Sequence, residues 1–200
     1  MRILKISIVF GLIISILMSM ARFDALCSDL RKNIFRLHIK AASDSASDQS
    51  LKLKVRDALL NEYGDDFVNC SNKEEAINFA TANIDNFRFT AEKIIKDNGF
   101  DYGVSVNVGE NYFENREYET FTLPAGDYES LNIIIDEGKG KNWWCVMFPA
   151  VCLGASGSLN DAVDDKSAGI AENSSDFKIR FKTVEIYEDF KKIFKNRKNK

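Results

Sequence analysis

The residues that could carry catalysis are few and scattered. The chain of 200 residues has one histidine, His38, in a segment whose alternating apolar and polar residues predict a strand. A serine–histidine hydrolase needs its imidazole beside a nucleophile and an orienting acid, and the neighbouring sequence supplies no such set. A zinc site needs more imidazoles or paired thiols, and the four cysteines form no Cys-x-x-Cys pair. We therefore expect no metal, no cofactor and no enzymatic activity.

Carboxylates are the exception, because the chain has 30 acidic residues. A pair of carboxyl groups could hydrolyse a glycosidic bond. Asp44, Asp48 and Asp57 lie close together in sequence, but a Ser-Asp-Ser run before a helix is more typical of a helix cap. A cell-wall hydrolase or wall-binding protein therefore stays open as the alternative function.

Apolar chemistry is concentrated in residues 138–152, which read GKGKNWWCVMFPAVC and hold both tryptophans. Neighbouring residues of a strand point to opposite faces, so one of Trp143 and Trp144 is expected to enter the core while the other faces outward. An exposed aromatic side chain on a rigid apolar loop is typical of a binding hot spot. The alternative is a hairpin that belongs to the core. Gly138–Lys141 lacks the complete phosphate-loop pattern and is expected to be a hairpin tip.

Cys145 and Cys152 are expected to form a disulfide, which an extracytoplasmic location permits. The chain-entropy model assigns about 2.5 kcal/mol to so short a loop. Two buried free thiols are the alternative. Four cysteines allow three pairings, so Cys27 and Cys70 are left unassigned.

Both ends of the chain differ from its middle. Residues 1–21 combine a basic start, a 15-residue uncharged run from Ile6 to Met20 and a Ser-Met-Ala exit. This pattern predicts a signal peptide, or else an uncleaved anchor, and either places the rest outside the cytoplasm. The last ten residues hold six basic groups and no acidic one. They form either a solvated helix end or a contact with an anionic membrane surface. The acidic remainder argues against nucleic-acid binding.

The periodicities predict an α+β fold: a mostly antiparallel sheet with two to three helices packed on one side, after an N-terminal signal peptide. The expected division is 1–21 signal peptide or anchor, 30–152 α+β domain, 153–176 flexible linker or loop, and 177–200 strand and helix with a basic tail. Within the domain we expect strands at 35–39, 102–108, 117–123 and 128–136. Helices are expected at 48–63, ended by Gly64, and from a cap at residue 71 or 72 to Ile95.

Two segments carry a resemblance to a known family. The run GKGKNWWCVMFPAVC strongly resembles a signature of the stage II sporulation protein R family of endospore-forming bacteria. The stretch FRLHIKAASDSASDQSLKLKVRDALL is similar to that family's R-L-H-x-x-A-x-S-D-S-x-x-D-Q-x-L-K-x-x-V-R-D region, and LPAGDYESL to its approach to the Gly-Lys loop. The resemblance covers about residues 34–152. Ala42, Asp136 and Ala150 stand where the family usually has Asn, Gly and a second Pro.

The resemblance implies a signalling role. Members of the family are made in the forespore and exported into the space between the two membranes of the sporulating cell. There they trigger a membrane-embedded aspartic protease of the mother cell, which removes the pro-sequence of a sigma factor. The basic tail lies outside the matching motifs.

The resemblance and the aromatic cluster together define candidate site residues. Asn142, Trp143, Trp144, Phe148 and Pro149 are expected to bind the protease, in a loop closed by Cys145–Cys152 and hinged at Gly138 and Gly140. A second contact would use Arg36, His38, Asp44, Asp48 and Arg56. The favoured alternative for this second segment is a structural strand–turn–helix, in which Asp44 or Ser45 caps the helix and Arg56 pairs with an acid.

Overall fold

The computed structural model describes residues 2–151 and 158–198, with side chains up to residue 192. The chain forms two compact units, each built from separate stretches of sequence. The sheet unit comprises Asn33–Asn111 and Asp127–Ala162. The terminal unit comprises Met1–Lys32, Tyr112–Gly126 and Val163–Lys200, so it joins the two ends of the chain with a central segment.

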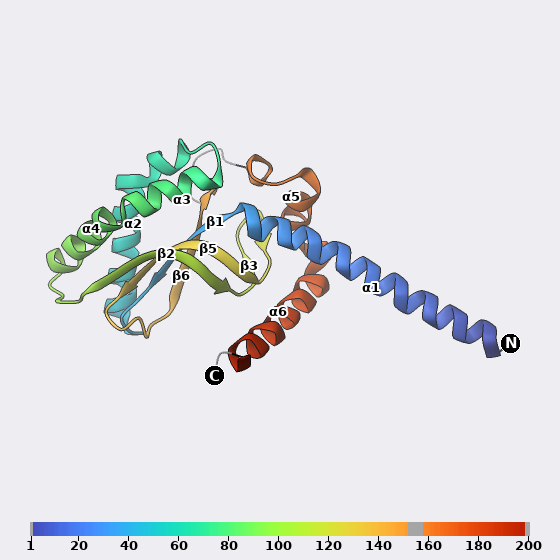
Figure 1. Cartoon of the computed structure of the whole chain (residues 1–200). Helices are drawn as coiled ribbons and strands as arrows, with labels where there is room; N and C mark the ends of the chain where they lie inside the picture. The colour runs from blue at the N-terminus through green and yellow to red at the C-terminus, as the bar shows by residue number, and fades with distance from the viewer. Residues whose placement is uncertain (1, 152–157, 199–200) are drawn as a thin grey trace. The chain divides into compact units, whose positions relative to one another are not determined.

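A four-stranded sheet forms the framework of the sheet unit (Figure 1). Its order is β2 (Val104–Phe113), β5 (Gly126–Ile135), β1 (Phe35–Lys40) and β6 (Asn142–Phe148). The central strand β1 pairs in parallel with β5 and antiparallel with β6. The α+β class is confirmed, but the sheet is mixed, and the expectation of a mostly antiparallel sheet is wrong at its central pair.

Three helices pack on one face of this sheet. They are α2 (Ala46–Val68), α3 (Lys73–Ala82) and α4 (Ile84–Asp97). The core joins alternate strand residues such as Leu37, Ile133 and Cys145 with helix residues such as Val55 and Phe87. This alternation follows from the two-residue period of a strand.

The helix boundaries differ from the expected ones at two places. Gly64 does not end α2, which runs on to Val68 with Gly64 buried inside it. The single long helix expected up to Ile95 is two helices, because Asn83 leaves the helical conformation and its side-chain amide donates to the Phe79 carbonyl oxygen at 2.9 Å. Asn72 caps α3 as expected, since its Oδ1 accepts from the Glu75 N–H at 2.9 Å.

The connection from β5 to β6 is not the expected hairpin tip. These two strands lie on opposite sides of β1, so residues 136–141 must cross the end of β1. Asp136 and Gly138 take positive φ angles of 55° and 58° on the way. Glycine is favourable at position 136 because it adopts a positive φ angle without strain. Aspartate is one of the few other residues that tolerate this conformation.

The described residues contain six α-helices, more than the two to three expected, because the other three lie in the terminal unit: α1 (Arg2–Asn33), α5 (Asp165–Glu172) and α6 (Lys178–Lys198). The unit also has β3 (Arg116–Glu117) paired with β4 (Thr122–Leu123), and the 3-10 helix η3 (Ser174–Phe177). A second 3-10 helix, η2 (Leu159–Asp161), belongs to the sheet unit.

Three sequence-based expectations for these segments are wrong. The expected linker at 153–176 contains η2, α5 and most of η3; residues 152–157 lie outside the described part. The expected strand at 177–181 belongs to η3 and α6. The expected strand at 117–123 is reduced to the short strands β3 and β4.

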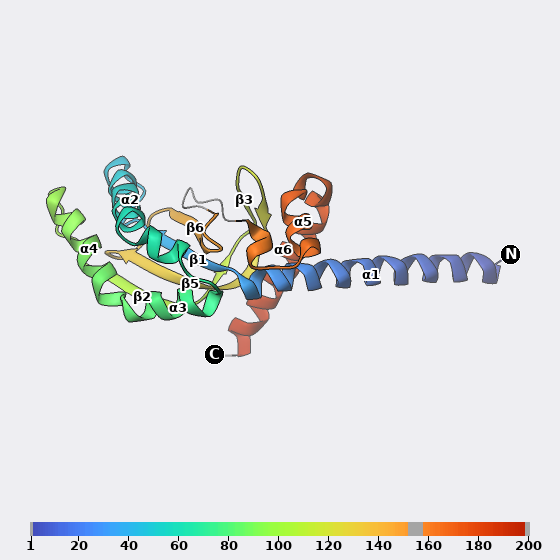
Figure 2. The ribbon, with the colours of Figure 1, turned by 90° about the horizontal axis from the view of Figure 1, so that it is seen from above.

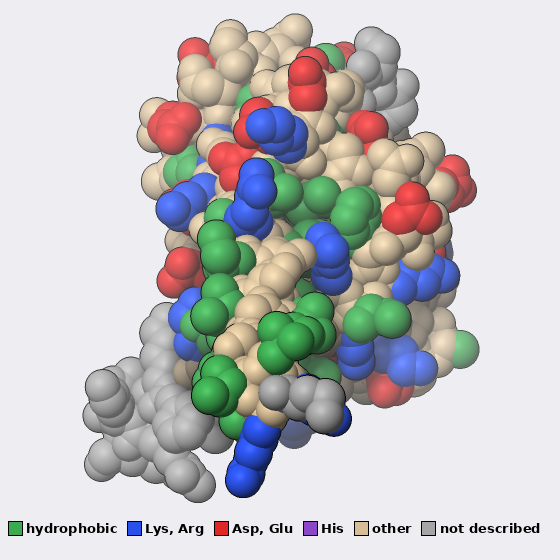
Figure 3. Space-filling model, turned by 90° about the vertical axis from the view of Figure 1, so that its right-hand side faces the viewer, with side chains coloured by type: hydrophobic (Ala, Val, Ile, Leu, Met, Phe, Trp, Pro, Cys, Tyr) green, Lys and Arg blue, Asp and Glu red, His purple; other side chains and the backbone are tan. Residues whose placement is uncertain are grey.

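Helix α1 has two halves with different surroundings. Its large apolar side chains between Ile3 and Met18 are exposed, whereas Phe23, Cys27 and Leu30 are buried. Figure 3 shows hydrophobic side chains gathered over the exposed half. Among the described helices, α1 is the one long and apolar enough to cross a membrane, which fits a signal peptide or an anchor.

Candidate partner-binding surface

The Gly-Lys-Gly loop is docked onto the chain that leaves β1. The Lys139 N–H donates to the Ala42 carbonyl oxygen at 3.1 Å, and the Gly140 N–H donates to the Ala41 carbonyl oxygen at 2.9 Å. A Cβ atom on Gly140 would lie 2.2 Å from the Ser43 carbonyl oxygen. Only glycine therefore allows this approach. The two glycines allow the chain to cross the end of β1, and the expected hinge at Gly138 and Gly140 stays a prediction.

Side chains of the segment 43–52 form hydrogen bonds with the backbone of Lys141, at the end of the same loop. The Asp44 carboxylate accepts from the Lys141 N–H at 2.7 Å. The Lys52 ammonium donates to the Lys141 carbonyl oxygen at 3.0 Å and to the Gln49 side-chain oxygen at 2.7 Å. Lys52 is buried, and this burial lowers the pKa of its ammonium group, while the nearby Asp44 charge partly opposes the shift.

The start of α2 is organised by its own serines and acids. Ser45 is the N-cap, and its Oγ accepts from the Asp48 N–H at 3.1 Å. Asp48 is buried and accepts hydrogen bonds from the Ser43 hydroxyl at 2.5 Å and the Tyr102 hydroxyl at 3.3 Å. The expectation that Ser45 caps this helix is confirmed. The Asp48 carboxylate thus binds two hydroxyl groups, and the Asp44 carboxylate holds the Lys141 backbone.

The two tryptophans lie on opposite faces of β6, as expected. Trp143 is opposite Ile39 and packs against the core beneath α2, with the Arg56 guanidinium 4.9 Å from its ring centre. Arg56 also pairs with Asp57 at 2.6 Å, which confirms the expected ion pair. Trp144 is opposite His38 on the other face, and their ring centres are 6.3 Å apart.

That other face of the sheet carries a polar group centred on His38. Its Nε2 lies 2.8 Å from Oδ1 of Asn142 on β6, and its Nδ1 lies 3.3 Å from Oδ1 of Asn132 on β5. Asn132 is itself held, because its amide donates to the Asn107 side-chain oxygen at 3.2 Å. The half-buried rings of His38 and Trp144 and the exposed Asn142 thus lie on a prepositioned surface.

Comparison with known proteins shows to which family the chain belongs. A family model described as stage II sporulation protein R matches residues 31–157. The chain belongs to the stage II sporulation protein R family. A curated relative, stage II sporulation protein R of Bacillus subtilis (strain 168), is 34% identical over 118 residues, which cover 59% of this chain and 53% of the relative. The chain thus spans about half the length of that relative. No solved structure matches the chain.

The structure brings the two family motifs together, and their expected contacts with a partner stay predictions. We define the motif surface by the accessible side chains His38, Asn142 and Trp144 on the sheet face away from α2–α4, whereas Trp143 packs against the core on the other face. His38 comes from the R-L-H segment, and Asn142 and Trp144 come from the N-W-W segment. Direct hydrogen-bond contacts link the segments at Asp44 with Lys141 and at His38 with Asn142.

Several expected site residues are structural instead of accessible. Phe148 and Pro149 are buried, and Phe148 belongs to the core cluster. Arg36 is buried too, with its guanidinium 4.8 Å from the ring centre of Tyr128. Asp48 is buried at the start of α2. These side chains are therefore not part of the accessible motif surface, and their expected contact with a partner stays a prediction.

The cysteine pair stays a prediction. Cys145 is buried in β6, and Cys152 lies outside the described residues. Within the described part of the chain, no group of three or more His, Cys, Asp or Glu side chains could hold a metal ion.

Sequence reasoning missed Lys52, Gln49 and Asn132 as organising residues. Lys52 and Gln49 fall at positions of the family pattern, which was a usable signal for both. Asn132 had a local signal, because it interrupts the apolar run LNIII of β5 with a buried amide.

Proposed function

We propose that this chain is an exported signalling protein of endospore formation. In this proposal it leaves the forespore, reaches the space between the two membranes and activates a membrane-embedded aspartic protease of the mother cell. The protease then processes the precursor of a mother-cell sigma factor. Family membership supports the role in sporulation, and the apolar N-terminal half of α1 supports export.

The observation that carries the proposal is the union of the two family motifs into the motif surface. The two acids of the family motif that sequence suggested for catalysis have structural partners, since Asp48 is buried and Asp44 holds the Lys141 backbone. A binding role needs prepositioned aromatic and polar groups, because ordering them beforehand lowers the cost of association. Trp144 beside His38 and Asn142 meets that need. The motif surface therefore fits a ligand for another protein.

The test is reconstitution in a non-sporulating host. The candidate protease and its sigma-factor precursor are co-expressed with or without this chain, and the shortened sigma factor is detected by immunoblot. We expect processing to require this chain, and to fail when a charge at Leu12 interrupts the exposed apolar half of α1. Processing at the same level without the chain would refute the proposal that the chain activates the protease directly.

Trp144→Ala is the sharpest variant for this assay, since its ring lies on the sheet face away from α2–α4. We expect it to reduce processing at least tenfold while thermal unfolding stays close to wild type, in line with the loss of one hot-spot aromatic. Phe89→Ala is the matched control, because Phe89 is an exposed aromatic on α4, outside both motifs. Equal processing by both variants would refute the assignment of the motif surface.

A further inference from the structure

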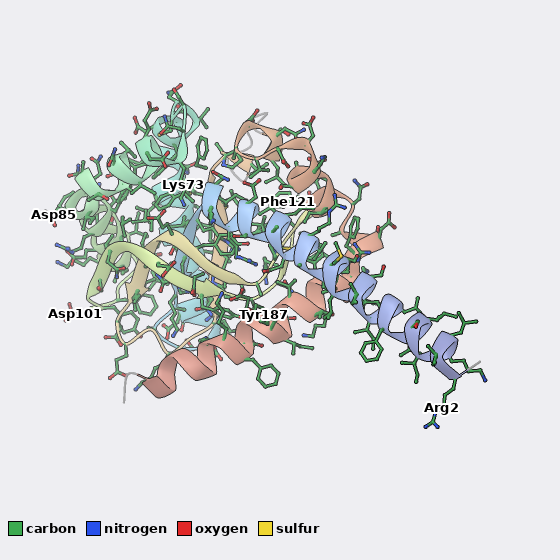
Figure 4. All side chains as sticks on the ribbon, turned by 45° about the vertical axis from the view of Figure 1, so that its right-hand side comes forward. Arg2, Lys73, Asp85, Asp101, Phe121 and Tyr187 are labelled. Carbon is green, nitrogen blue, oxygen red and sulfur yellow. The ribbon has the colours of Figure 1, made fainter. Side chains whose placement is uncertain are left out.

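Helix α6 carries apolar side chains on two opposite faces. Phe181 and Val184 are buried in the terminal unit. By contrast Ile179, Ile186, Tyr187 and Phe190 are exposed, by 84%, 49%, 56% and 58%. At 3.6 residues per turn these four fall on one side of the helix, roughly opposite the buried pair. Figure 4 marks Tyr187 on this helix.

Such a contiguous stripe requires an explanation, although single exposed apolar residues do not. The packed face already gives α6 its place in the unit, so the second stripe is not needed for folding. The family match ends at residue 157, so α6 lies outside it. The stripe is therefore a feature of this chain that the motif surface does not explain.

The charges around the stripe point to an anionic occupant. Basic side chains lie on either side of it at 178, 180, 182 and 191, and the sequence continues with basic residues at 195, 197, 198 and 200. The acids of the helix are turned to partners within the unit. Glu188 is buried, Asp189 accepts from the Tyr112 hydroxyl at 2.6 Å, and Glu185 accepts from the Asn115 amide at 3.0 Å. Lys182 and Lys191 also pair with Glu185 and Glu188 while remaining largely exposed.

The position of α1 in the same unit favours lipid as that occupant. Phe23 of α1 packs on Phe177 and Phe181, with ring centres 5.7 Å and 5.2 Å apart, directly after the exposed apolar half of α1. Arg180 lies beside the same rings. Figures 1 and 2 show α6 running across the direction of α1 instead of alongside it. A bilayer crossed by α1 would meet its surface close to the first turn of α6.

We propose that α6 is an interfacial helix that lies on an anionic lipid bilayer. Ile179, Ile186, Tyr187 and Phe190 enter the boundary between headgroups and acyl chains, and the flanking lysines and arginines meet lipid phosphates. This contact does not depend on the proposed protease partner. It would hold the terminal unit on the membrane even if the apolar half of α1 were removed by cleavage.

Photo-cross-linking on the full chain tests this directly. p-Benzoylphenylalanine replaces Phe190, or Phe89 as the matched exposed phenylalanine of the sheet unit, or Phe10 as a marker for α1. Each protein is inserted into vesicles of phosphatidylcholine with or without phosphatidylglycerol, irradiated and analysed by mass spectrometry. We expect several-fold more lipid adduct at position 190 than at 89, and a fall at 190 when phosphatidylglycerol is left out.

Charge neutralisation supplies the second arm. Lys178→Gln and Lys191→Gln should each lower the adduct at position 190, by up to about fivefold per residue, while the adduct at position 10 stays constant. Equal lipid adducts at 190 and 89 would overturn the proposal. An adduct at 190 with a second copy of the chain would overturn it too, because the stripe would then be a protein interface.

Discussion

Trp143 and Trp144 are neighbours in sequence with different surroundings. Trp143 packs against the core beneath α2 with Arg56 over its ring, so Trp143→Ala should lower the free energy of unfolding by about 2–3 kcal/mol. Trp144 lies on the other face, and Trp144→Ala should lower it by less than about 1 kcal/mol. Denaturant unfolding of the two variants measures this difference. Equal losses would place both indoles in the core and leave the motif surface without its aromatic group.

Gly140 is the second residue whose type is dictated by its surroundings. A methyl group there would collide with the Ser43 carbonyl oxygen, a backbone atom that cannot rotate away. We expect Gly140→Ala to cost about 1–3 kcal/mol and to reduce sigma-factor processing, because the loop would lift from Ala41.

Gly103→Ala is the control for that prediction, since nothing lies within 4 Å of a Cβ atom at Gly103. Hydrogen exchange of the Lys139 and Gly140 amides reports whether the loop has lifted. Unchanged protection in Gly140→Ala would contradict the docked geometry.

At the scale of elements, the start of α2 links local sequence to the motif surface. Ser45 caps the helix, and the same turn presents Asp44 to the Lys141 N–H. Ser45→Ala should therefore lower stability by about 1 kcal/mol and weaken the hold on the Gly-Lys-Gly loop. Ser50→Ala, at an exposed position within α2, should change stability by less than about half as much. Thermal unfolding of both variants checks this, and equal losses would argue against the cap.

Some elements could be predicted from sequence because their signals are local. The alternation of FRLHIK specified β1, and SDSASD specified the start of α2. Helix α5 was missed because its segment is rich in small residues, yet its Ser167 N–H donates to Asp164 at 2.7 Å and Ala168 and Ile170 are buried. The hydrogen bond from the Ser167 N–H lowers the pKa of the Asp164 carboxyl, as expected for an N-cap.

The sheet order could not be predicted, since it depends on contacts between distant residues. A short Gly-rich connection normally joins neighbouring antiparallel strands, so 136–141 suggested a hairpin. The parallel pairing of β1 with β5 places β1 between the two strands instead. That pairing brings His38 next to Asn132, and the pairing of β1 with β6 brings it next to Asn142, although the two asparagines lie 94 and 104 residues away in sequence.

At the scale of the whole molecule, the expected boundary at Ala21 falls inside one continuous helix. The second half of α1 belongs to the folded terminal unit. Leu30 is buried, and the Arg31 guanidinium donates to the Ala125 carbonyl oxygen at 3.1 Å and pairs with Asp24 at 3.1 Å. Residues 22–33 therefore have a structural role whether or not the preceding segment is removed.

A matched pair of leucine variants separates the two halves of α1. Leu30 is fully buried, whereas Leu12 is 59% exposed. In the full chain held in detergent micelles, Leu30→Ala should destabilise the terminal unit by about 2–5 kcal/mol, because it leaves a cavity beneath α1. Leu12→Ala should leave the stability of that unit unchanged, because the exposed Leu12 side chain is not packed in its core. Hydrogen exchange of residues 112–126 and 163–192 measures both effects, with the β1 amides as an internal reference. Similar loss of protection in the two variants would mean that the exposed half of α1 also holds the terminal unit together, and that cleavage at Ala21 would unfold it.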